Sequence, residues 1–362
     1  MPDSLLIHSG QGEYQVDFVE TLPALVARLT PLRFSGMVID RRVAALYADA
    51  LASLCAAMPV VQVDASEEEK TLAGAAKVLE FMQANRFSRQ SQLLAVGGGI
   101  VQDLASFSAH VYYRGIRWGF VPTTLLAMAD SCIGAKCCLN LNRHKNQLGA
   151  FHAPASVWIL TEFLGTLPDN DVRSGYGEIV KLALTAPGGL FGELREALKH
   201  GGLRSPQLPG LIRKGLQVKQ AIIEQDEYEA DLRRLLNYGH TFGHALETLS
   251  AYEVPHGLAV AWGMDLANWV ACQKGLHAMA DFTEVHDFLA QHFGGSLSRP
   301  VAASALIEGA KRDKKAAGAT VSLVLPQGSG VLAIVPTPLD GALEAIVAEY
   351  LRRWSFIRTL SV

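Results

Sequence analysis

Three histidines within seventeen residues are the clearest sign of chemistry in this sequence. In NYGHTFGHALETL, His240, His244 and Glu247 follow one another at intervals of four and three residues, a spacing that places them on one face of a helix. His256, in VPHGLAV, follows a short loop and could return to that face. Such imidazoles can hold a divalent metal, although isolated histidines are more often hydrogen-bonded core residues. The glutamate of H-E-x-x-H zinc peptidases is absent, which disfavours peptidase chemistry.

Charged side chains on apolar segments form a second group of candidates. Glu178 and Lys181 lie one helical turn apart in SGYGEIVKLAL. They form either a simple ion pair worth roughly a few tenths of a kcal/mol or, if they are buried near a metal, a ligand and its partner. Most lysines are merely solvated, but lysines grouped in a cleft would neutralise phosphate and carboxylate groups. The lysines of interest are Lys136 and Lys145 around CCLNLNRH, Lys219 within a helical stretch, and Lys314 with Lys315 before a late pair of strands.

A glycine run offers a possible phosphate site. Gly97, Gly98 and Gly99 follow the apolar run LLAV and precede the helical stretch IVQDLASFSAHVYY. Residues without a Cβ let the backbone approach a ligand closely, and the following helix would present N–H groups to a pyrophosphate. The spacing is not the G-x-G-x-x-G of a Rossmann turn, so a tight bend at a strand end is an equal alternative.

The elements that must position these residues change in character near Pro168. Before it, apolar runs such as SGMVID, MPVVQVD, QLLAVGGG and WGFVPTT alternate with helical stretches, which predicts a mostly parallel sheet with helices on its faces. After it, helical spacing dominates, and only ATVSLVLPQGSGVLAIVP reads as two strands around a turn. We therefore predict an α/β nucleotide-binding domain over residues 1–168 and a mainly helical, all-α metal-binding domain over residues 169–362, with ligands in a cleft between them.

Composition narrows the class of protein. The net charge of −3 comes from 32 basic and 35 acidic side chains, so no overall field attracts nucleic acid or an anionic membrane, and we expect neither as a partner. The N-terminal residues do not show a signal-peptide pattern, and no apolar run is long enough to span a bilayer, so we expect a cytoplasmic protein. The five cysteines include no C-x-x-C pair, which predicts that they are reduced.

Taken together, an ordered set of segments resembles the sugar phosphate cyclases, and within them the 3-dehydroquinate synthase family. The segments lie between Asp40 and Lys315 and are GGGIVQDLASFSAHVYYRGI, VPTTLLAMADSCIGAK, HKNQLGAFHAP, FLGTLP, GYGEIVK, DLRRLLNYGHTFGHALE and PHGLAVAWGM. The resemblance implies an enzyme, a phosphate-eliminating carbon–oxygen lyase of the shikimate pathway. It also implies that the enzyme binds NAD and a zinc ion, for which cobalt can substitute, and that it forms a homodimer. It also revises the metal site: the implied ligands are Glu178, His240 and His256, while His244 contacts the substrate.

The resemblance assigns the other site residues as well. The implied cofactor contacts are Asp40, Glu67, Lys70, Gly97, Gly98, Gly99, Asp103, Thr123, Thr124, Lys145, Thr166 and Leu167. The implied substrate contacts are Asp130, Lys136, Asn146, Lys181, Lys219, Arg233, Asn237, His244 and one of Lys314 and Lys315, with Arg114 reaching the phosphate bound by a neighbouring subunit. Because Arg233 and Asn237 are four residues apart, we expect them to share a helical face with His240. A guanidinium there suits a carboxylated sugar phosphate.

The implied reaction converts 3-deoxy-D-arabino-heptulosonate 7-phosphate into 3-dehydroquinate and phosphate. It proceeds by NAD-mediated oxidation, phosphate elimination, reduction and aldol closure, and the cofactor ends as it began. Zinc would polarise the alcohol oxygen in the oxidation step. Holding the reacting ends close together would favour the final ring closure.

Several positions depart from the pattern of the family. Cys137 and Cys138 stand where a threonine and a small residue are usual, HKN replaces the commoner GKN, and Leu258 replaces a glutamate. Relatives that cyclise sedoheptulose 7-phosphate often carry HKN, yet they tend to have Asp and Pro where this chain has Asn237 and His244. Deoxy-inosose synthases tend to carry Glu at the Asn237 position. These features favour a carboxylated substrate.

Three alternatives remain open on the sequence. One is a secondary-metabolism cyclase acting on sedoheptulose 7-phosphate or an amino analogue. Another is a metal-dependent NAD alcohol or glycerol dehydrogenase, which would release NADH and would not need the phosphate-binding lysines. The third is an inactive homologue that binds NAD, whose expected sign would be the loss of a metal ligand or key lysine. No such loss is evident in the sequence.

Overall fold

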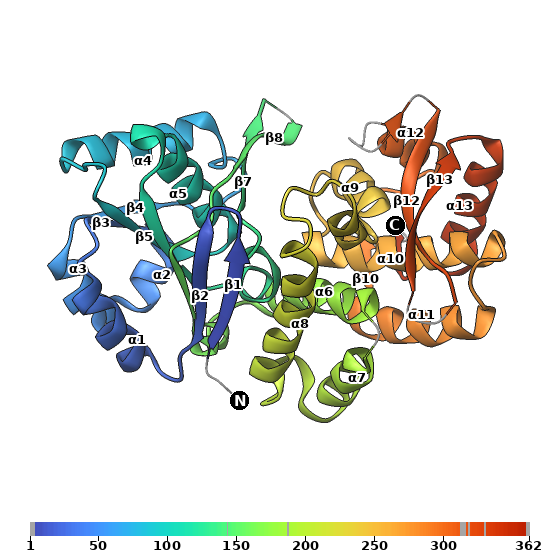
Figure 1. Ribbon diagram of the computed structural model, residues 1–362. Coiled ribbons are helices and arrows are strands. Elements are labelled where there is room, and N and C mark those ends of the chain that lie inside the picture. The colour runs from blue at the N-terminus through green and yellow to red at the C-terminus, as the bar shows by residue number, and fades with distance from the viewer. Residues whose placement is uncertain are drawn as a thin grey trace. The chain divides into compact units, whose positions relative to one another are not determined.

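The chain divides into two compact units in a computed structural model, which describes residues 4–142, 144–186, 188–311, 316–317, 319–328 and 331–359 (Figure 1). One unit comprises Met1–Pro168 with Ile223–Tyr228, and the other comprises Asp169–Ile222 with Glu229–Val362. The short return of residues 223–228 is held in the first unit by Glu227, which accepts a hydrogen bond from the Gly10 N–H at 2.7 Å. The Tyr228 ring also packs on Phe151, with ring centroids 5.0 Å apart. Lys314 and Lys315 lie outside the described residues.

The first unit is built on a seven-stranded sheet that is parallel except at one edge. Its strands, in spatial order, are β1 (Ser4–Ser9), β2 (Gly12–Phe18), β9 (Ser156–Ile159), β6 (Arg117–Pro122), β5 (Gln92–Gly97), β3 (Gly36–Asp40) and β4 (Val60–Val63). Only β1 and β2 pair antiparallel. The central strands are apolar and buried along almost their whole length, as parallel strands covered on both faces require. The predicted mostly parallel sheet is confirmed.

Helices surround this sheet (Figure 1), and three of them, α1, α2 and α4, begin at residues with capping side chains. They are α1 (Leu22–Leu29), α2 (Arg41–Leu46), α3 (Ala48–Ala57), α4 (Leu72–Ala84) and α5 (Gly99–Val111). The hydroxyls of Thr21 and Thr71 accept hydrogen bonds from N–H groups in the first turns of α1 and α4, and the Asp40 carboxylate does the same for α2. Short helical turns follow at Thr30–Leu32, Tyr112–Arg114, Ala127–Ser131 and Thr161–Gly165.

A separate hairpin completes the first unit. Strands β7 (Lys136–Leu141) and β8 (His144–Phe151) pair antiparallel, in a region for which the sequence patterns had predicted no strand. An isolated bridge joins Asn140 on β7 to Thr71, at the start of α4. The hairpin is therefore attached to the region that follows β4.

The second unit is mainly helical, as predicted. Its helices are α6 (Asp169–Thr185), α7 (Leu190–Gly201), α8 (Leu208–Ile223), α9 (His240–Leu249), α10 (His256–Gln273), α11 (Met279–Phe293), α12 (Ala303–Lys311) and α13 (Gly341–Arg353). Short helical turns lie at Gly202–Arg204 and Leu232–Asn237. Strand β12 (Thr320–Pro326) pairs antiparallel with β13 (Leu332–Pro338), which confirms the expected strand pair. β11 (Ala316–Ala317) joins them, while β10 (Gly295–Leu297) pairs with β14 (Ile357–Thr359).

Helix α10 is the centre of the second unit, and glycines let α6 and α9 approach it at backbone distance. All its residues from Gly257 to Ala271 are buried. A Cβ on Gly177 of α6 would lie 2.1 Å from the Gly257 carbonyl oxygen, and a Cβ on Gly257 would lie 1.7 Å from that of Ser174. Gly239, at a φ of +77°, would place a Cβ 2.5 Å from the Val260 carbonyl oxygen. No larger residue fits at these crossings.

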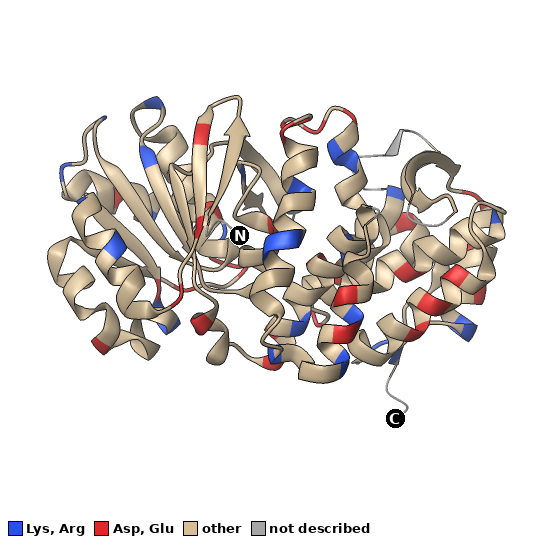
Figure 2. Ribbon diagram, turned by 60° about the horizontal axis from the view of Figure 1, so that its bottom comes forward, with Lys and Arg blue, Asp and Glu red and all other residues tan. Residues whose placement is uncertain are grey.

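Among the described residues, none of the helices has the length and apolar character that crossing a membrane requires. Acidic and basic positions are interspersed along the helices of each unit (Figure 2), in keeping with the small net charge of −3.

Candidate metal centre and cofactor-binding region

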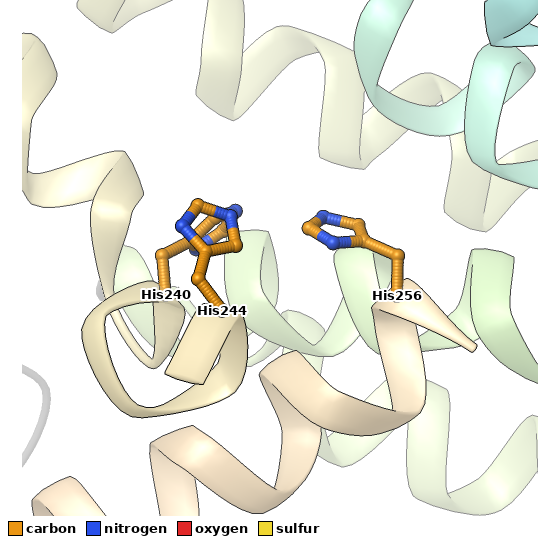
Figure 3. Close-up of side chains that lie close together, drawn as sticks. All are labelled: His240, His244 and His256. Atoms are coloured by element: carbon orange, nitrogen blue, oxygen red, sulfur yellow. The ribbon is translucent and has the colours of Figure 1, made fainter. Parts of the chain in front are cut away.

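Three histidine rings from two helices of the second unit point toward one another (Figure 3). His240 and His244 come from α9, and His256 is the first residue of α10. The ring centroids lie 5.2 Å apart for His240 and His244, 5.4 Å for His240 and His256, and 5.7 Å for His244 and His256. One nitrogen of each ring lies within 4.8 Å of the others, close enough for a common metal ion.

A buried carboxylate from α6 meets two of these rings. Glu178 Oε1 lies 3.3 Å from His256 Nε2 and 3.8 Å from His240 Nε2. Ligand bonds of about 2.1 Å in a tetrahedral zinc site place neighbouring donor atoms about 3.4 Å apart, so these three atoms fit one ion. The set of one carboxylate and two imidazoles is also the one that the sequence resemblance implied. His244 is the exposed member of the group.

The glycine contacts explain how these ligands come together. Because α6 and α9 approach α10 at backbone distance, side chains next to the crossings are brought close to one another. Each ligand adjoins one of the crossing glycines: Gly177 precedes Glu178, Gly239 precedes His240, and Gly257 follows His256.

Hydrogen bonds on the far side of each ring orient the imidazoles. His240 Nδ1 lies 3.1 Å from the Tyr238 carbonyl oxygen, which can only accept, so Nδ1 must carry the proton and Nε2 presents its lone pair. His256 Nδ1 lies 3.0 Å from Glu247 Oε2. Supporting groups of this kind are typical of metal-binding histidines. The sequence patterns had placed Glu247 on the histidine face of α9 but had not identified it as the partner of His256.

The charges of the site favour a cation. Burial disfavours the charged form of Glu178, but Lys181 and His256 hold the pKa of this carboxyl well below its usual range, so it is ionised as a ligand must be. Desolvation would by itself lower the pKa of His256, whereas the carboxylates of Glu247 and Glu178 raise it to about 10. The surroundings thus stabilise positive charge at this point, which a divalent ion would supply.

Four basic side chains are buried among the described residues, and all four belong to the set predicted to bind cofactor or substrate. They are Lys70, Lys181, Lys219 and Arg233, with exposed fractions of 7%, 2%, 5% and 3%. Lysine and arginine are almost never fully buried unless they are paired. Lys181 forms an ion pair with Glu178, and Lys70 forms one with Asp103. Burying a cation costs solvation free energy, and buried charged groups of this kind are typical of functional sites.

The expected shared face of Arg233, Asn237 and His240 is wrong. Residues Leu232–Asn237 form a 3-10 helix with three residues per turn, and Gly239, with a φ of +77°, separates it from α9, which begins at His240. A separation of four residues therefore does not place Arg233, Asn237 and His240 on one helical face. The Asn237 amide instead donates hydrogen bonds to Glu229 and to the Arg234 carbonyl oxygen.

In the first unit, the predicted cofactor contacts gather at the carboxyl edge of the parallel sheet. Asp40 ends β3, Gly97 ends β5, and Thr123 with Thr124 follows β6. These three strands are neighbours, and the strand order reverses at β3, because the chain moves from β3 to β4 on one side and then to β5 on the other. Such a switch point is where open α/β sheets bind nucleotides. The remaining contacts follow neighbouring strands: Glu67 and Lys70 come after β4, and Thr166 and Leu167 after β9.

The three glycines of the run Gly97–Gly99 differ in the space around them. A Cβ on Gly97 would lie 2.4 Å from Val101 Cγ2, and one on Gly98 would lie 2.8 Å from Thr124 Cγ2, so packing requires both glycines. A Cβ on Gly99 would meet nothing within 4 Å. Gly99 opens α5, whose first N–H groups lack intrahelical partners and so suit a pyrophosphate. Close packing thus accounts for Gly97 and Gly98, and Gly99 is the glycine of the run with space for a ligand.

A cluster of side chains lies beside this edge. Lys70 Nζ is 2.7 Å from Asp103 Oδ2; burial disfavours the ammonium, but the Asp103 carboxylate raises the pKa of Lys70 above its ordinary value. Lys145 Nζ lies 3.7 Å from Glu67 Oε2, and Asn146 belongs to the same hydrogen-bonded group.

The other predicted substrate contacts of the first unit belong to different elements. Lys136 is the exposed first residue of β7, and Asp130 lies in the turn Ala127–Ser131. Arg114 is exposed in the turn Tyr112–Arg114, which follows the far end of α5. It is therefore roughly 20 Å from Gly99 along that helix.

The chain is similar to known proteins over most of its length. Residues 60–174 match the family described as 3-dehydroquinate synthase N-terminal, and residues 175–316 match 3-dehydroquinate synthase C-terminal. The 3-dehydroquinate synthase of Sulfurimonas denitrificans is 35% identical over 319 residues, which is 87% of this chain and 90% of that protein. The one from Legionella pneumophila strain Philadelphia 1 is 40% identical over 258 residues, 70% of each chain.

Solved structures of related cyclases have the same fold. A 2-deoxy-scyllo-inosose synthase complexed with carbaglucose-6-phosphate, NAD+ and Co2+ superposes with a TM-score of 0.85 at 26% identity, covering 96% of this chain and 99% of that one. A 2-epi-5-epi-valiolone synthase from Streptomyces hygroscopicus subsp. jinggangensis with NAD+ and Zn2+ gives a TM-score of 0.83 at 28% identity. The match covers 94% of this chain and 97% of that one. A glycerol dehydrogenase from Schizosaccharomyces pombe, at 13% identity and a TM-score of 0.59, shares the fold alone.

Proposed function

This chain belongs to the 3-dehydroquinate synthase family, and on that premise we propose that it converts 3-deoxy-D-arabino-heptulosonate 7-phosphate into 3-dehydroquinate and phosphate. The observation that carries the proposal is the convergence of Glu178, His240 and His256 from three helices, with Lys181 paired to the carboxylate. Neither a peptidase nor a simple binding module requires this arrangement together with a glycine at the start of a helix where the strand order of the sheet reverses.

The two bound groups would supply the redox chemistry. When bound, NAD supplies the reversible oxidation of a substrate hydroxyl, and a divalent metal supplies polarisation of that oxygen. We assign the metal to Glu178, His240 and His256, with zinc as the first choice and cobalt as the alternative, since related structures hold one or the other. We assign NAD to the carboxyl edge around Gly99, where the backbone is open to a pyrophosphate.

The protein's own side chains would hold the substrate and set its charges. Arg233 has the planar fork that binds both oxygens of a carboxylate. Lys181 and Lys219 are buried cations suited to anionic oxygens. Asn237 and His244 would hydrogen-bond substrate hydroxyls, and the described substrate contacts of the first unit, Asp130, Lys136 and Asn146, would complete the set.

In this environment the phosphate group of the substrate takes up the proton that oxidation has made acidic, and phosphate leaves by elimination. Return of the same hydride would then reduce the ketone again, so that NAD would end as it began, and ring opening with an intramolecular aldol closure forms the carbocycle. Because both reacting ends belong to one bound molecule, confinement accelerates this last step. We further propose that the enzyme is a cytoplasmic homodimer in which Arg114, remote from Gly99 along α5, serves the neighbouring copy.

A panel of sugar phosphates tests the proposal. Phosphate release would be measured with 3-deoxy-D-arabino-heptulosonate 7-phosphate, sedoheptulose 7-phosphate and glucose 6-phosphate, each with a divalent metal and only catalytic NAD. We expect the heptulosonate to be turned over fastest without accumulation of NADH. Fastest turnover of another sugar phosphate would assign a secondary-metabolism cyclase, whereas steady NADH release from a simple polyol would assign a dehydrogenase.

The role of Arg233 separates these substrates further. Replacement of Arg233 by alanine should lower kcat/KM for the heptulosonate much more than for a sugar phosphate that lacks the acid, because only the former loses a bidentate ion pair. The neighbouring Arg234→Ala variant is the matched control and should behave like the wild type. Equal losses on both substrates would show that Arg233 does not bind the carboxylate.

A further inference from the structure

Two side chains of β7 that have no assigned role contact the predicted substrate residue Asn146. The Cys138 thiol donates to Asn146 Oδ1 over 3.1 Å, and Asn140 Oδ1 accepts from the Asn146 N–H at 2.9 Å. Both residues lie on β7, whose register with β8 shifts between Leu139 and Leu141. Asn146 is therefore bound through both its side chain and its backbone by two residues of the neighbouring strand.

The backbone of Asn146 needs such support. Its φ of +55° lies in the left-handed region, which residues other than glycine seldom adopt, although asparagine tolerates it better than most. Conformations of this kind persist when the surroundings determine them, and they concentrate at functional sites. The bonds from Cys138 and Asn140 are the local contacts that favour this conformation over an ordinary extended one.

The same two residues are tied to the predicted cofactor contacts. The Cys138 N–H donates to Asp103 Oδ1 at 2.9 Å, and the Cys138 sulfur lies 3.6 Å from Asp103 Oδ2. The Asn140 amide donates to Glu67 Oε1 at 2.8 Å and to the Glu67 carbonyl oxygen at 3.2 Å. A continuous set of contacts thus runs from the cofactor side of the unit to Asn146.

The Cys138 thiol acts as a hydrogen-bond donor here and not as a nucleophile. Burial and the charge of Asp103 raise the pKa of Cys138 to about 12, so the sulfur keeps its proton at neutral pH. The adjacent Cys137 is directed elsewhere and donates to the Ala150 carbonyl oxygen at 3.4 Å. Since a small residue is usual at position 138, the contact with Asn146 distinguishes this chain from the pattern that it otherwise resembles.

We propose that Cys138 and Asn140 are positioning residues that hold Asn146 in its left-handed conformation and link it to the cofactor contacts Asp103 and Glu67. The proposal rests on the proposed function, in which Asn146 contacts the sugar phosphate. It predicts that Cys138 and Asn140 act on turnover through Asn146 and have little effect once Asn146 has lost its side chain.

A double-mutant cycle tests this dependence. In the wild-type background, Cys138→Ala should lower kcat/KM for the preferred sugar phosphate by roughly three- to tenfold, the effect of losing one hydrogen bond that orients a contact. In the Asn146→Ala background, the same change should lower it by less than about twofold, because coupled residues are not additive. Asn140→Ala should show the same pattern. Cys138→Ser retains a donor and should recover most of the lost activity.

Controls separate positioning from loss of folding. Cys137→Ala changes the adjacent thiol and should leave kcat/KM unchanged, while melting curves should show all variants folded. Losses of equal size with and without the Asn146 side chain would overturn the proposal, as would a folded Cys138→Ser variant no more active than Cys138→Ala. If Asn140→Ala does not fold, the Cys138 variants by themselves test the proposal. Wild-type protein that releases no phosphate from any substrate would refute the proposed function itself, a result distinct from additive losses in an active enzyme.

Discussion

The two regions that carry the predicted site are built in opposite ways. In the second unit, Glu178, Lys181 and Arg233 are almost fully buried, and the metal-binding helices cross at glycines with no space to spare. In the first unit, the predicted cofactor contacts lie mainly at strand ends and on a hairpin, where the predicted cofactor contact Lys145 is only half-buried and the predicted substrate contact Asn146 is exposed. The contrast teaches that the candidate metal centre is part of a packed core, whereas the predicted cofactor edge combines one buried ion pair, Lys70 with Asp103, with partly exposed side chains.

The reason lies in the cost of burying charge. A carboxylate or ammonium removed from water loses several kcal/mol of solvation, which only close partners can offset. Glu178 and Lys181 are such partners, so each depends on the other for stability as well as for chemistry. At the predicted cofactor edge, the pair of Lys70 and Asp103 is buried in the same way, whereas Lys145 and Glu67 are partly exposed and can be altered with less damage to the fold.

We expect the largest effect from removing a candidate metal ligand whose side chain is partly exposed. His256→Ala should eliminate bound metal and reduce phosphate release to background, since two remaining ligands do not hold an ion in an open site. Its side chain is 32% exposed, so the fold should persist. Metal content by mass spectrometry and the phosphate assay would be measured on the same sample. An active, metal-free variant would refute the ligand assignment.

Breaking the buried ion pair should have the next largest effect, on stability. Lys181→Met removes the lysine partner of the buried Glu178 carboxylate, leaving His256 as its cationic neighbour, and should lower the free energy of unfolding by about 3 kcal/mol. Lys214→Met, which removes an exposed partner of Glu193, should lower it by less than about 1 kcal/mol. Denaturant titration of the metal-free proteins measures both. Similar losses for the two variants would mean that burial does not set the strength of the Glu178 pair.

The supporting carboxylate should have an intermediate effect. Glu247→Ala removes the partner of His256 Nδ1 and should weaken metal affinity or activity by about 10–100-fold, the usual consequence of losing such a partner. Glu253→Ala, in the loop between α9 and α10, removes an exposed carboxylate bound to Ser298 and serves as the control. Competition with a chelator would give the affinities. Unchanged metal affinity in the Glu247 variant would show that the bond is only structural.

The smallest effects should come from the glycine run at the cofactor edge. Gly97→Ala meets Val101 and should destabilise the fold by about 1–3 kcal/mol. Gly99→Ala meets no neighbour and should leave the free energy of unfolding within about 0.5 kcal/mol of the wild type, yet weaken NAD binding severalfold. Thermal melting and NAD titration would separate the two. Unimpaired NAD binding by a stable Gly99→Ala protein would move the pyrophosphate away from this helix.

Local patterns in the sequence were sufficient for the regular elements and failed at particular irregular ones. Strands β3, β5 and β6 were predictable because continuous apolar runs are typical of buried parallel strands. The hairpin of β7 and β8 was missed, because its residues are mixed in polarity and two of them, Asn142 and Asn146, have positive φ. The face shared by Arg233 and His240 was wrong because a 3-10 turn and Gly239 interrupt the helical period.

The types and local spacing of residues determined, without any structure, that this chain alternates strands and helices before Pro168 and is mainly helical after it. They also placed His240 and His244 one turn apart on a helix and singled out His256, and through the resemblance they named Glu178, His240 and His256 as the metal ligands and assigned His244 to the substrate. Only the tertiary structure decided that Glu178 faces His240 and His256, that Glu247 orients His256, and that Asn146 is held by β7. These contacts join distant segments, and they depend on glycine crossings and on partners for buried charge, neither of which periodicity within one element can reveal.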